Sequence, residues 1–543
     1  MKVFTLLLSF FTTLLVYGTA INYKNGNFFT SFTDLVVPGG EQDLEITRTY
    51  NSKSTYEGWF GFGYGSMYET NLKTSADGSV TIYENGAGAT TRFVPKDAVN
   101  VEAASLRIVE AMKKKETMSE SAVKTLVERL KNSAEDREIY TQKYGVEAKI
   151  ADGVMLYSND RGMQTVEKIK EGFKRSYSDG RFDLFNQQGK LTKMVYKSGY
   201  AISFDYTGSQ LTTIKDTTGK NIALTWYPEG RVKTAMSGAD KKMAEYFYDT
   251  RGNLIKSKDV ADNVYLFDYD NNHNMTLITY ADKTSVKIAY TKESLAKELI
   301  ERNGDYTRYT YESNPKNPEL HYWTIVKKKV GSAPESVSRF EYEMKLKPDG
   351  QQYTYRVATE LDGIKSETIY SECCSLPLKI TRGSDVTTFE YNPKGLLTKK
   401  TSTKGEFVQL DYDDKINKIT KVVNNDGWTT FAYDKAGNLS KAVNSQGKSV
   451  LLIYDRNGKI SRMMDQDGAN EKSRRTLSFK YNTLGKPAEI EMEGVGIINV
   501  AYDNYGEIKK VESKTGATMA LQVTQAFQTL LSIVKPAGVN LNM

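Results

Sequence analysis

Residues suited to acid–base or nucleophilic chemistry are scarce in this sequence. The chain of 543 residues has two histidines, His273 and His321, and two adjacent cysteines, Cys373 and Cys374. A Ser-His-Asp or Cys-His site would need one of these histidines beside a nucleophile, yet His273 lies in the turn-like stretch "YDNNHNM". Two histidines and a vicinal cysteine pair also lack the spacing of a zinc site. We therefore expect no enzymatic activity, no catalytic residue and no cofactor.

Carboxylates are abundant, but they recur in one sequence context. Aspartate follows tyrosine again and again, at Asp249, Asp270, Asp434, Asp455 and Asp503. A glycosidase needs one pair of carboxylates whose surroundings separate their pKa values. Carboxylates that return at every turn of the chain are better explained as turn residues. A carbohydrate-active enzyme stays open as an alternative without an identifiable pair.

One acidic segment is a weak candidate for calcium binding. In "DQDGANE", the oxygen-bearing side chains of Asp465, Asp467, Asn470 and Glu471 surround Gly468, and Ca²⁺ prefers such oxygen ligands. The full spacing of an EF-hand loop is absent. A solvated hairpin tip is therefore the favoured interpretation, and no other metal site is expected.

The strongest pattern in the chain is a repeat. Starting from Phe185, an aromatic residue returns after 21 residues in 11 of the 14 steps between 15 anchors. A fixed period of this kind indicates units that stack into one continuous structure. The tyrosines expected to anchor these units are Tyr206, Tyr227, Tyr248, Tyr269, Tyr290, Tyr311, Tyr391, Tyr412, Tyr433, Tyr454, Tyr481 and Tyr502.

Each unit reads as a β-hairpin. Apolar residues alternate before the anchor, as at Val408, Leu410 and Tyr412, which places them on one face of a strand. Asp or Asn and then Gly follow, as in "YDKAGNL", a pattern typical of a tight turn with glycine at positive φ. Fifteen hairpins give about 30 strands, and a twisted sheet of that length must curl. The glycines expected in these turns are Gly252, Gly395, Gly437, Gly458 and Gly506.

Composition agrees with an all-β fold and argues against a nucleic-acid partner. The chain has 36 Tyr and 41 Gly but only 11 Pro, which favours many short strands joined by turns. Its 74 basic and 67 acidic residues give a net charge of +7 without long blocks of one sign. This mixed surface lacks the basic patch that nucleic-acid binding requires.

The N-terminus predicts export. "MKVFTLLLSFFTTLLVYGTA" combines a lysine, an apolar run and the small residues Gly18 and Ala20, so residues 1–20 read as a signal peptide. A buried first helix or a membrane anchor is the alternative. No other segment is apolar for long enough to form a transmembrane helix. We expect a secreted, cell-surface or periplasmic protein with no stable membrane span.

Two further segments depart from the repeat. Residues 21–96 read as an N-terminal β region, and residues 97–150 as a helical insert, with the repeats at 151–512. Residues 513–543 read as a C-terminal helix and tail, which we expect to dock inside or against the curled sheet, with membrane attachment as the alternative. The helical spacing is carried by Met519, Val523, Phe527, Leu530, Leu531 and Val534.

The repeat resembles the rearrangement-hotspot (RHS) or YD-repeat family, whose unit is Tyr-Asp, a Gly turn, a following Leu and a return to aromatic-x-Tyr. The resemblance covers about residues 173–510, and "LEITRTYNS" and "GWFGFGYGSMYET" are similar to the region that precedes the repeats in many members. It implies a β-shell or partial cocoon around a hollow interior. In toxin-delivering members the shell holds a C-terminal toxic domain. This sequence shows no "DPxGxxxG"-like core motif, so the resemblance implies a shell without the core motif or an encoded toxin domain.

These observations favour an exported, non-enzymatic shell that acts in containment, adhesion or scaffolding at the cell surface or outside the cell. One alternative is a component of a toxin or effector system that encloses a separately encoded cargo. Another is a carbohydrate-binding protein, because rows of exposed tyrosine can stack on sugar rings. The partners expected are therefore a protein cargo or a cell-surface glycan.

Overall fold

The computed structural model describes most of the chain. Several sequence predictions lie outside the described residues, namely the signal segment 1–18, Cys373 and Cys374, two of the four calcium candidates (Asn470 and Glu471), and Gly506. The described residues are 19–38, 41–86, 88–96, 100–158, 163–347, 352–361, 363–372, 375–468, 473–483, 485–502 and 508–534, without the side chains of 531–534.

The N-terminal strands form a small separate sheet. Its order is β1-β2-β3-β6, and all of its neighbours are antiparallel. Buried and half-buried residues alternate along β2 and β3, because one face of this sheet is packed against other strands. The elements are β1 (Thr19–Asn22), β2 (Asn27–Val37), β3 (Leu44–Asn51), β4 (Glu57–Gly58), β5 (Gly61–Phe62), β6 (Tyr64–Ser66) and the short helix η1 (Met67–Glu69).

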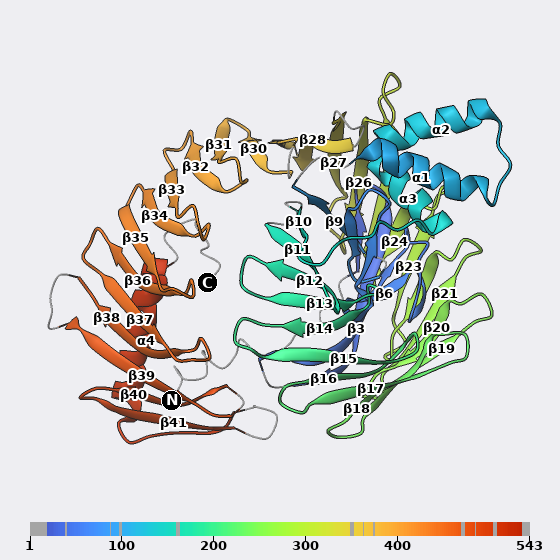
Figure 1. Ribbon diagram of the computed structural model, residues 1–543. Helices are drawn as coiled ribbons and strands as arrows, with labels where there is room; N and C mark the ends of the chain where they lie inside the picture. The colour runs from blue at the N-terminus through green and yellow to red at the C-terminus, as the bar shows by residue number, and fades with distance from the viewer. Residues whose placement is uncertain are drawn as a thin grey trace.

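Strands β4 and β5 pair with each other as a two-stranded sheet. A large sheet of 36 antiparallel strands contains the remaining strands and includes all the repeats. Its first part curls around the N-terminal strands (Figure 1), and we call this body the first lobe. The wall of the first lobe consists of β7 (Asn71–Thr74), β8 (Val80–Tyr83), β9 (Thr90–Pro95), β10 (Met155–Ser158), β11 (Gln164–Ile169), β12 (Gly172–Tyr177), β13 (Phe182–Asn186), β14 (Leu191–Val195), β15 (Ala201–Thr207), β16 (Gln210–Asp216), β17 (Asn221–Trp226), β18 (Val232–Ser237), β19 (Met243–Tyr248), β20 (Leu254–Lys258), β21 (Val264–Tyr269), β22 (Met275–Thr279), β23 (Ser285–Tyr290), β24 (Ala296–Ile300), β25 (Tyr306–Ser313) and β26 (His321–Lys329).

The sheet then crosses to a second body. The crossing segment, which we call the bridging strip, consists of β27 (Ser336–Leu346), β28 (Gln352–Leu361), β29 (Ile364–Tyr370), β30 (Pro377–Arg382), β31 (Asp385–Tyr391) and β32 (Leu397–Ser402). The second lobe follows, with β33 (Phe407–Tyr412), β34 (Ile419–Asn424), β35 (Gly427–Tyr433), β36 (Leu439–Asn444), β37 (Ser449–Tyr454), β38 (Ile460–Gln466), β39 (Arg475–Tyr481), β40 (Pro487–Met492), β41 (Gly496–Tyr502) and β42 (Ile508–Ser513).

This architecture confirms the predicted fold class. A long antiparallel sheet dominates the chain, it curls, and it is accompanied by a helical insert and a C-terminal helix. One boundary differs from the expected division. Strands β7–β9, which lie within the N-terminal region 21–96, belong to the sheet of the repeats, because β9 pairs with β10.

The helical insert projects from the first lobe (Figure 1) and consists of α1 (Val101–Lys113), α2 (Glu120–Asn132) and α3 (Ala134–Tyr144). Each helix begins at a side-chain cap, from Asn100, Ser119 and Ser133 respectively, which satisfies an amide that the helix leaves open. The insert is tied to the turn between β7 and β8 through Asp77, which pairs with Arg92 at 2.6 Å and with Arg137 at 3.1 Å. The insert therefore stands on the sheet as a small cap.

The C-terminal helix α4 (Gly516–Val534) lies against the concave side of the second lobe (Figure 1). Met519, Ala526 and Leu530 are buried in the core of that lobe, so the expected docking against the sheet is confirmed. Of the helices among the described residues, none is both long enough and apolar enough to cross a membrane.

Candidate functional site: the interior of the curled sheet

Each anchor tyrosine ties its unit to the unit before it. The Tyr433 hydroxyl donates a hydrogen bond of 2.7 Å to the carbonyl of Ile419, the residue that opens the second strand of the preceding hairpin. The same bond, with oxygen–oxygen distances of 2.6–3.0 Å, joins Tyr206 to Leu191, Tyr248 to Val232, Tyr269 to Leu254, Tyr290 to Met275, Tyr311 to Ala296, Tyr391 to Pro377, Tyr412 to Leu397, Tyr454 to Leu439, Tyr481 to Ile460 and Tyr502 to Pro487.

Tyr227 is the exception among the expected anchors. Trp226 takes the position instead, and its indole Nε1 donates to the Leu211 carbonyl at 2.8 Å. Leu211 stands opposite Tyr206 and only five residues after it, whereas Leu254 is six residues after Tyr248. The shorter turn moves the phase of the next unit by one residue. Counting tyrosines alone therefore selected the neighbour of the true anchor.

The register of the sheet shifts at each of these anchors except Tyr311. In the unit of Tyr433, the ladder pairs Ala432 with Lys441 and Tyr433 with Leu439, so Ser440 has no opposite residue. Its hydroxyl donates to the Ala432 carbonyl at 3.1 Å. Such a bulge bends a strand and increases its twist. Bulges that recur at these anchors therefore favour a ribbon that curls.

The Asp and Gly that recur in the units form the turn of the hairpin. The Asp434 carboxylate accepts hydrogen bonds from the amides of Ala436 (2.9 Å) and Asn438 (2.8 Å). Although partial burial opposes it, these bonds lower the pKa of Asp434. Gly437 has φ +78°, a region that residues with a Cβ rarely adopt. The other described turn glycines have similar values: Gly252 (+84°), Gly395 (+77°) and Gly458 (+75°).

His273 is a turn residue rather than part of a catalytic arrangement. It takes the glycine position of its unit with φ +63°, its Nδ1 lies 2.7 Å from the Asn253 side-chain oxygen, and its ring stacks on Phe62 at 4.1 Å. No described Ser, Cys or Asp side chain completes a triad with it. The structure thus gives His273 a role in fixing the turn to the N-terminal segment.

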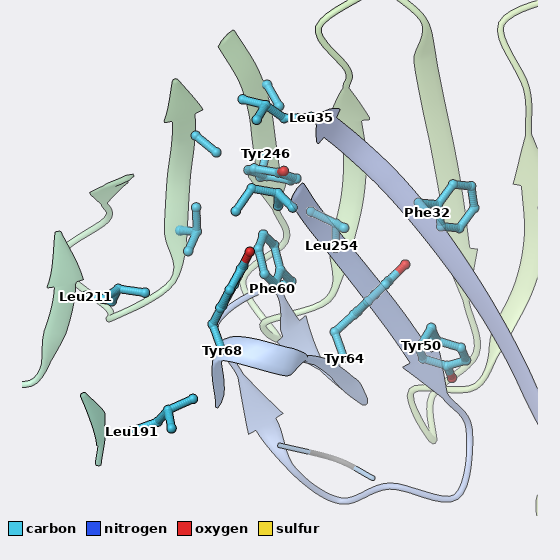
Figure 2. Packing of buried hydrophobic residues seen from close by; sticks show 14 of the residues in the cluster. Phe32, Leu35, Tyr50, Phe60, Tyr64, Tyr68, Leu191, Leu211, Tyr246 and Leu254 are labelled. Carbon is cyan, nitrogen blue, oxygen red and sulfur yellow. The ribbon is translucent and has the colours of Figure 1, made fainter. Parts of the chain in front are cut away.

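The interior of the first lobe is filled by the N-terminal strands. Figure 2 shows Phe60 of this segment beside Tyr246 of the repeat wall, with ring centroids 5.0 Å apart, and Tyr68 on the side of Leu211. Phe32 packs against Tyr265 and Phe267 of the wall at 5.4 and 5.3 Å. Backbone hydrogen bonds join the two at the turn ends, including Val232 N to Trp59 O at 2.8 Å and Phe62 N to Gly252 O at 3.0 Å. The N-terminal segment, residues 19–69, therefore fills the first lobe, and we call it the plug.

Two charged groups in this plug were not singled out from the sequence. Arg48 is fully buried, pairs with Asp34 at 2.8 Å and donates to Ser257 of the wall at 2.7 Å. The sequence does carry a signal for this pair. In "LEITRTYN" the arginine alternates with apolar residues on one face of a strand, and a buried arginine needs a charged partner. Glu69 is also buried and accepts hydrogen bonds from Trp59 N (2.8 Å) and Ser66 Oγ (3.1 Å). Burial raises the pKa of Glu69 to about 7.

The second lobe is filled by α4 and fixed by a buried ion pair. The Asp465 carboxylate accepts from Arg475 Nε at 3.0 Å, and Arg475 in turn donates to Gln525 of α4 at 3.2 Å and to Thr529 at 3.1 Å. Asp465 therefore faces the interior and not the hairpin tip. Asp467 forms an ion pair with Lys448 at 3.3 Å.

The described half of the calcium candidate is thus divided between two different surroundings. Among the described residues, no three His, Cys, Asp or Glu side chains converge as metal ligands would.

The bridging strip is a single layer of sheet with no plug of its own. From residue 345 to residue 407, none of the described residues is buried. On the face that continues from Phe340, which contacts Tyr23 of the plug at 4.4 Å, cross-strand pairing aligns a row of half-exposed side chains. This row consists of Tyr342, Val357, Thr368, Ile380, Thr387 and Phe389, and we call it the inner row.

The opposite face of the strip carries a charge cluster around Glu341. His321 Nε2 lies at 3.0 Å from this carboxylate, Arg356 Nη1 at 2.9 Å and Arg339 Nη2 at 2.9 Å. Burial alone would raise the pKa of Glu341, but these hydrogen bonds lower it to about 2. A hollow of about 310 Å³ lies beside the cluster, which includes Glu367. A carboxylate held this firmly in its charged form is unsuited to act as a general acid.

These features define a class: a repeat protein in which a curled antiparallel sheet forms a partial shell, filled at both ends by segments of its own chain. The RHS repeat family model matches residues 248–285, within the array that the 21-residue period and the anchor bonds delimit. The chain thus contains the RHS, or YD, repeat. A domain of unknown function, DUF6531, matches residues 18–93, which include the whole plug.

The chain is also similar to three solved structures of Tc toxins at low identity. TcdB2-TccC3 without its hypervariable C-terminal region is 10% identical with a TM-score of 0.38, over 95% of this chain and 31% of that one. TcdB2-TccC3-TEV is 11% identical with a TM-score of 0.33, over 93% and 30%. The Photorhabdus luminescens Tc holotoxin pore is 10% identical with a TM-score of 0.30, over 88% and 31%.

This chain therefore spans about 30% of the length of the structures it matches. None of the curated proteins matches it.

Proposed function

We propose that this protein is an exported, non-enzymatic shell that encloses a separate polypeptide against the inner face of its bridging strip. The observation that carries this proposal is the uncovered inner row between two lobes that are both filled. A single-layer sheet with apolar side chains on one face is normally covered by another element. Here the plug covers this face at one end and α4 covers the second lobe at the other, which leaves the middle free for a partner.

The chemistry of the inner row supports a protein partner. Val357, Ile380 and Phe389 supply apolar surface, and Thr368 and Thr387 supply hydroxyl groups among them. Apolar surface removed from water stabilises a complex by about 25 cal/mol per Å². A polypeptide can cover such a mixed row with its side chains, which suits containment better than adhesion or scaffolding through the outer face.

A glycan partner is less favoured because the tyrosine rows are already engaged. Eleven anchor hydroxyls donate to backbone carbonyls of the neighbouring unit. Eight of the rings, all except those of Tyr391, Tyr481 and Tyr502, pack against the two cores. Sugar stacking would need exposed ring faces, so carbohydrate binding is not proposed here.

The test is protease protection of the enclosed partner. The full chain is isolated from its source, treated with protease, and examined for a second polypeptide that survives digestion. Ile380→Asp with Phe389→Asp places charge on the inner row and is expected to abolish protection. Thr388→Asp with Glu390→Gln, on the opposite face of the same strand, is the matched control and should retain it. Equal protection in both variants, or no protected polypeptide at all, contradicts containment.

A further inference from the structure

The hairpins leave one backbone amide per unit outside the ladder. In the unit of Tyr433, the turn closes with Asp434 N donating to Asn438 O at 2.8 Å. Antiparallel pairs alternate between hydrogen-bonded and non-hydrogen-bonded, so the next pair, Tyr433 and Leu439, does not exchange backbone bonds. The N–H and C=O of Leu439 then point together toward the following unit. The carbonyl receives the Tyr454 hydroxyl at 2.8 Å, and the amide lies beside it.

In the first lobe, atoms of the plug accept hydrogen bonds from the backbone amides at this position. Val232 N donates to Trp59 O at 2.8 Å and Ala296 N donates to Gly26 O at 2.9 Å. Met275 N donates to the Tyr50 hydroxyl at 3.0 Å. The amides of three different units are therefore closed by one partner segment, and this segment is the N-terminal part of the chain.

The spacing of these contacts matches an extended partner. Neighbouring units are two strands apart, or roughly 10 Å, and an extended chain covers this distance in about three residues. Trp59 contacts the unit that contains Val232, and Phe62, three residues later, contacts the next unit through Gly252 O. At this place an extended segment thus reaches two successive units with residues three apart.

The last strand of the bridging strip and the second lobe offer the same row, and no described segment crosses it as the plug crosses the first lobe. The equivalent amides belong to Leu397, Ile419, Leu439 and Ile460, which stand opposite their anchors in the same bulged register. Within the described part of the chain, no acceptor in a turn, a loop or a side chain takes a hydrogen bond from these four amides. Proline, which has no N–H, takes the equivalent place at Pro377 and Pro487 on either side of the row, as is allowed where the ladder does not use the amide.

Lysine side chains donate to nearby glycine carbonyls of the second lobe, as Lys190 Nζ does to Gly208 O at 3.0 Å in the first. Lys418 Nζ donates to Gly437 O at 2.6 Å, and Lys459 Nζ donates to Gly485 O at 3.0 Å. In the first lobe the carbonyl of Gly252, which is equivalent to that of Gly437, is instead closed by the plug through Phe62 N. The second lobe satisfies its acceptors with its own lysines and leaves a row of donors.

The phenols beside the two rows differ in their exposure to water. Burial raises the pKa of Tyr412, Tyr433 and Tyr454 in the second lobe to about 12. In the first lobe, where the plug adds cover, burial raises the pKa of Tyr248 and Tyr269 well above the ordinary value of 10. The anchor bond is the same in both lobes, so the contrast reflects the cover that the plug adds in the first.

We infer that the amides of Leu397, Ile419, Leu439 and Ile460 form a docking row for an extended polypeptide segment, which we call the donor row. The segment accepts hydrogen bonds from these amides, as Trp59 O and Gly26 O of the plug do from Val232 N and Ala296 N in the first lobe. This inference rests on the proposed function, because it names the part of an enclosed polypeptide that the second lobe holds. A helix is excluded as the occupant, since its carbonyls are used within the helix.

The test uses the full chain and a fluorescein-labelled synthetic peptide with the sequence of residues 57–66, the plug segment that crosses the first-lobe turns. Leu439→Pro with Ile460→Pro removes two donors by the substitution that Pro377 and Pro487 already carry. Leu439→Val with Ile460→Val keeps both N–H groups and is the matched control. Two lost hydrogen bonds should weaken peptide binding about tenfold, while the valine variant should stay within about threefold of the original.

A second measurement keeps the inference testable if the proline variant does not fold. In the unaltered chain, saturating peptide should slow hydrogen exchange at the Leu439 and Ile460 amides and leave the closed amides of Val232 and Ala296 unchanged. No peptide binding, equal affinity of the proline and valine variants, or unchanged exchange overturns the donor row. Binding of a uronic-acid oligosaccharide in place of the peptide, with the same loss in the proline variant, also overturns it, because the row would then hold a glycan.

The outcomes separate this inference from the proposed function. Peptide binding through the donor row without any protease-protected polypeptide would contradict containment and retain the site. A protected polypeptide without a response at the donor row would retain containment and overturn the site.

Discussion

At the scale of single residues, the anchor hydroxyl is what joins one hairpin to the next. An aromatic ring alone would fill the same space, but only a donor at its tip can satisfy the carbonyl of the preceding unit, and an unsatisfied buried carbonyl costs about 1–3 kcal/mol. Trp226 makes this clear, because its indole N–H replaces the phenol in the one unit whose phase is shifted.

Substitution should therefore distinguish Trp226 from its neighbour. Trp226→Phe removes both the bond to Leu211 O and part of the packing, and we expect it to lower the free energy of unfolding by about 2 kcal/mol. Tyr227→Phe removes only a 3.2 Å bond to Tyr246 O and should cost less than about 1 kcal/mol. Urea unfolding of the two variants measures the difference. A larger loss for Tyr227→Phe would restore Tyr227 as the anchor.

Glu69 predicts a pH dependence of stability. Its pKa in the folded protein, about 7, lies above the ordinary value of 4.5, so the folded state holds a proton that the unfolded state has released. Stability should therefore fall as the pH rises from about 4.5 to 7 and level off above 7, by about 3 kcal/mol from this group. Glu69→Gln stays neutral and should lose this part of the dependence. Urea midpoints of both proteins at pH 5 and pH 8 check the prediction. If the difference between the two midpoints is the same in Glu69→Gln as in the unaltered chain, the prediction is contradicted.

At the scale of elements, the turn glycine sets the shape of each hairpin. A Cβ on Gly437 would meet open space, so the cost of substitution lies in its positive φ alone. We expect Gly437→Val to lower the free energy of unfolding by about 1–2 kcal/mol. Gly437→Asn should cost clearly less, since asparagine tolerates this region. Melting temperatures of both variants test the turn, and equal values would argue against strain at this position.

Helix α4 depends on the ion pair beneath it. Arg475→Met leaves the Asp465 carboxylate buried without its partner, which is strongly destabilising, and we expect the helix to leave the sheet more often. Thermolysin should then cut within residues 516–534 at least about tenfold faster. Arg462→Met, at an exposed position of the neighbouring strand β38, is the control. If both variants are cut at the same rate as the unaltered chain, the ion pair does not hold the helix.

Much of this could be read from the sequence because its signals are local. The 21-residue period, the alternation before Tyr433 and the glycine of each turn follow from contacts within one or two units. The pairing of Arg48 with Asp34 could not be read in this way, because its burial depends on Ser257 and Tyr246, more than 200 residues away. The anchor at Trp226 was missed for a different reason, since a one-residue change in a turn leaves the composition of the unit intact.

At the scale of the whole molecule, the alternation of the strands does not show which units are covered. The strip carries the same pattern as the lobes, at Thr387, Phe389 and Tyr391 for example, yet none of its described residues from 345 to 407 is buried. What differs is the presence of a plug or of α4, and each of these comes from a distant part of the chain. The sequence therefore predicted the wall but not the open section within it.

The open section should also be the least stable part of the sheet. Regions with few buried apolar contacts open at low free energy, so we expect amides of β28–β32 to exchange with solvent at least about tenfold faster than those of β19–β24. Hydrogen exchange followed by mass spectrometry on the isolated chain measures this contrast. Uniform protection across the sheet would mean that the strip is already covered, and would leave no room for a partner.

The bond from each anchor reaches back by a single unit and no further. Where units touch only their neighbours, energies add along the array, so a hairpin of 21 residues in the bridging strip, which neither the plug nor α4 covers, can be inserted or removed as one cassette. On the proposed function, the number of such units would set how much the shell can hold, and duplication of one unit would enlarge it.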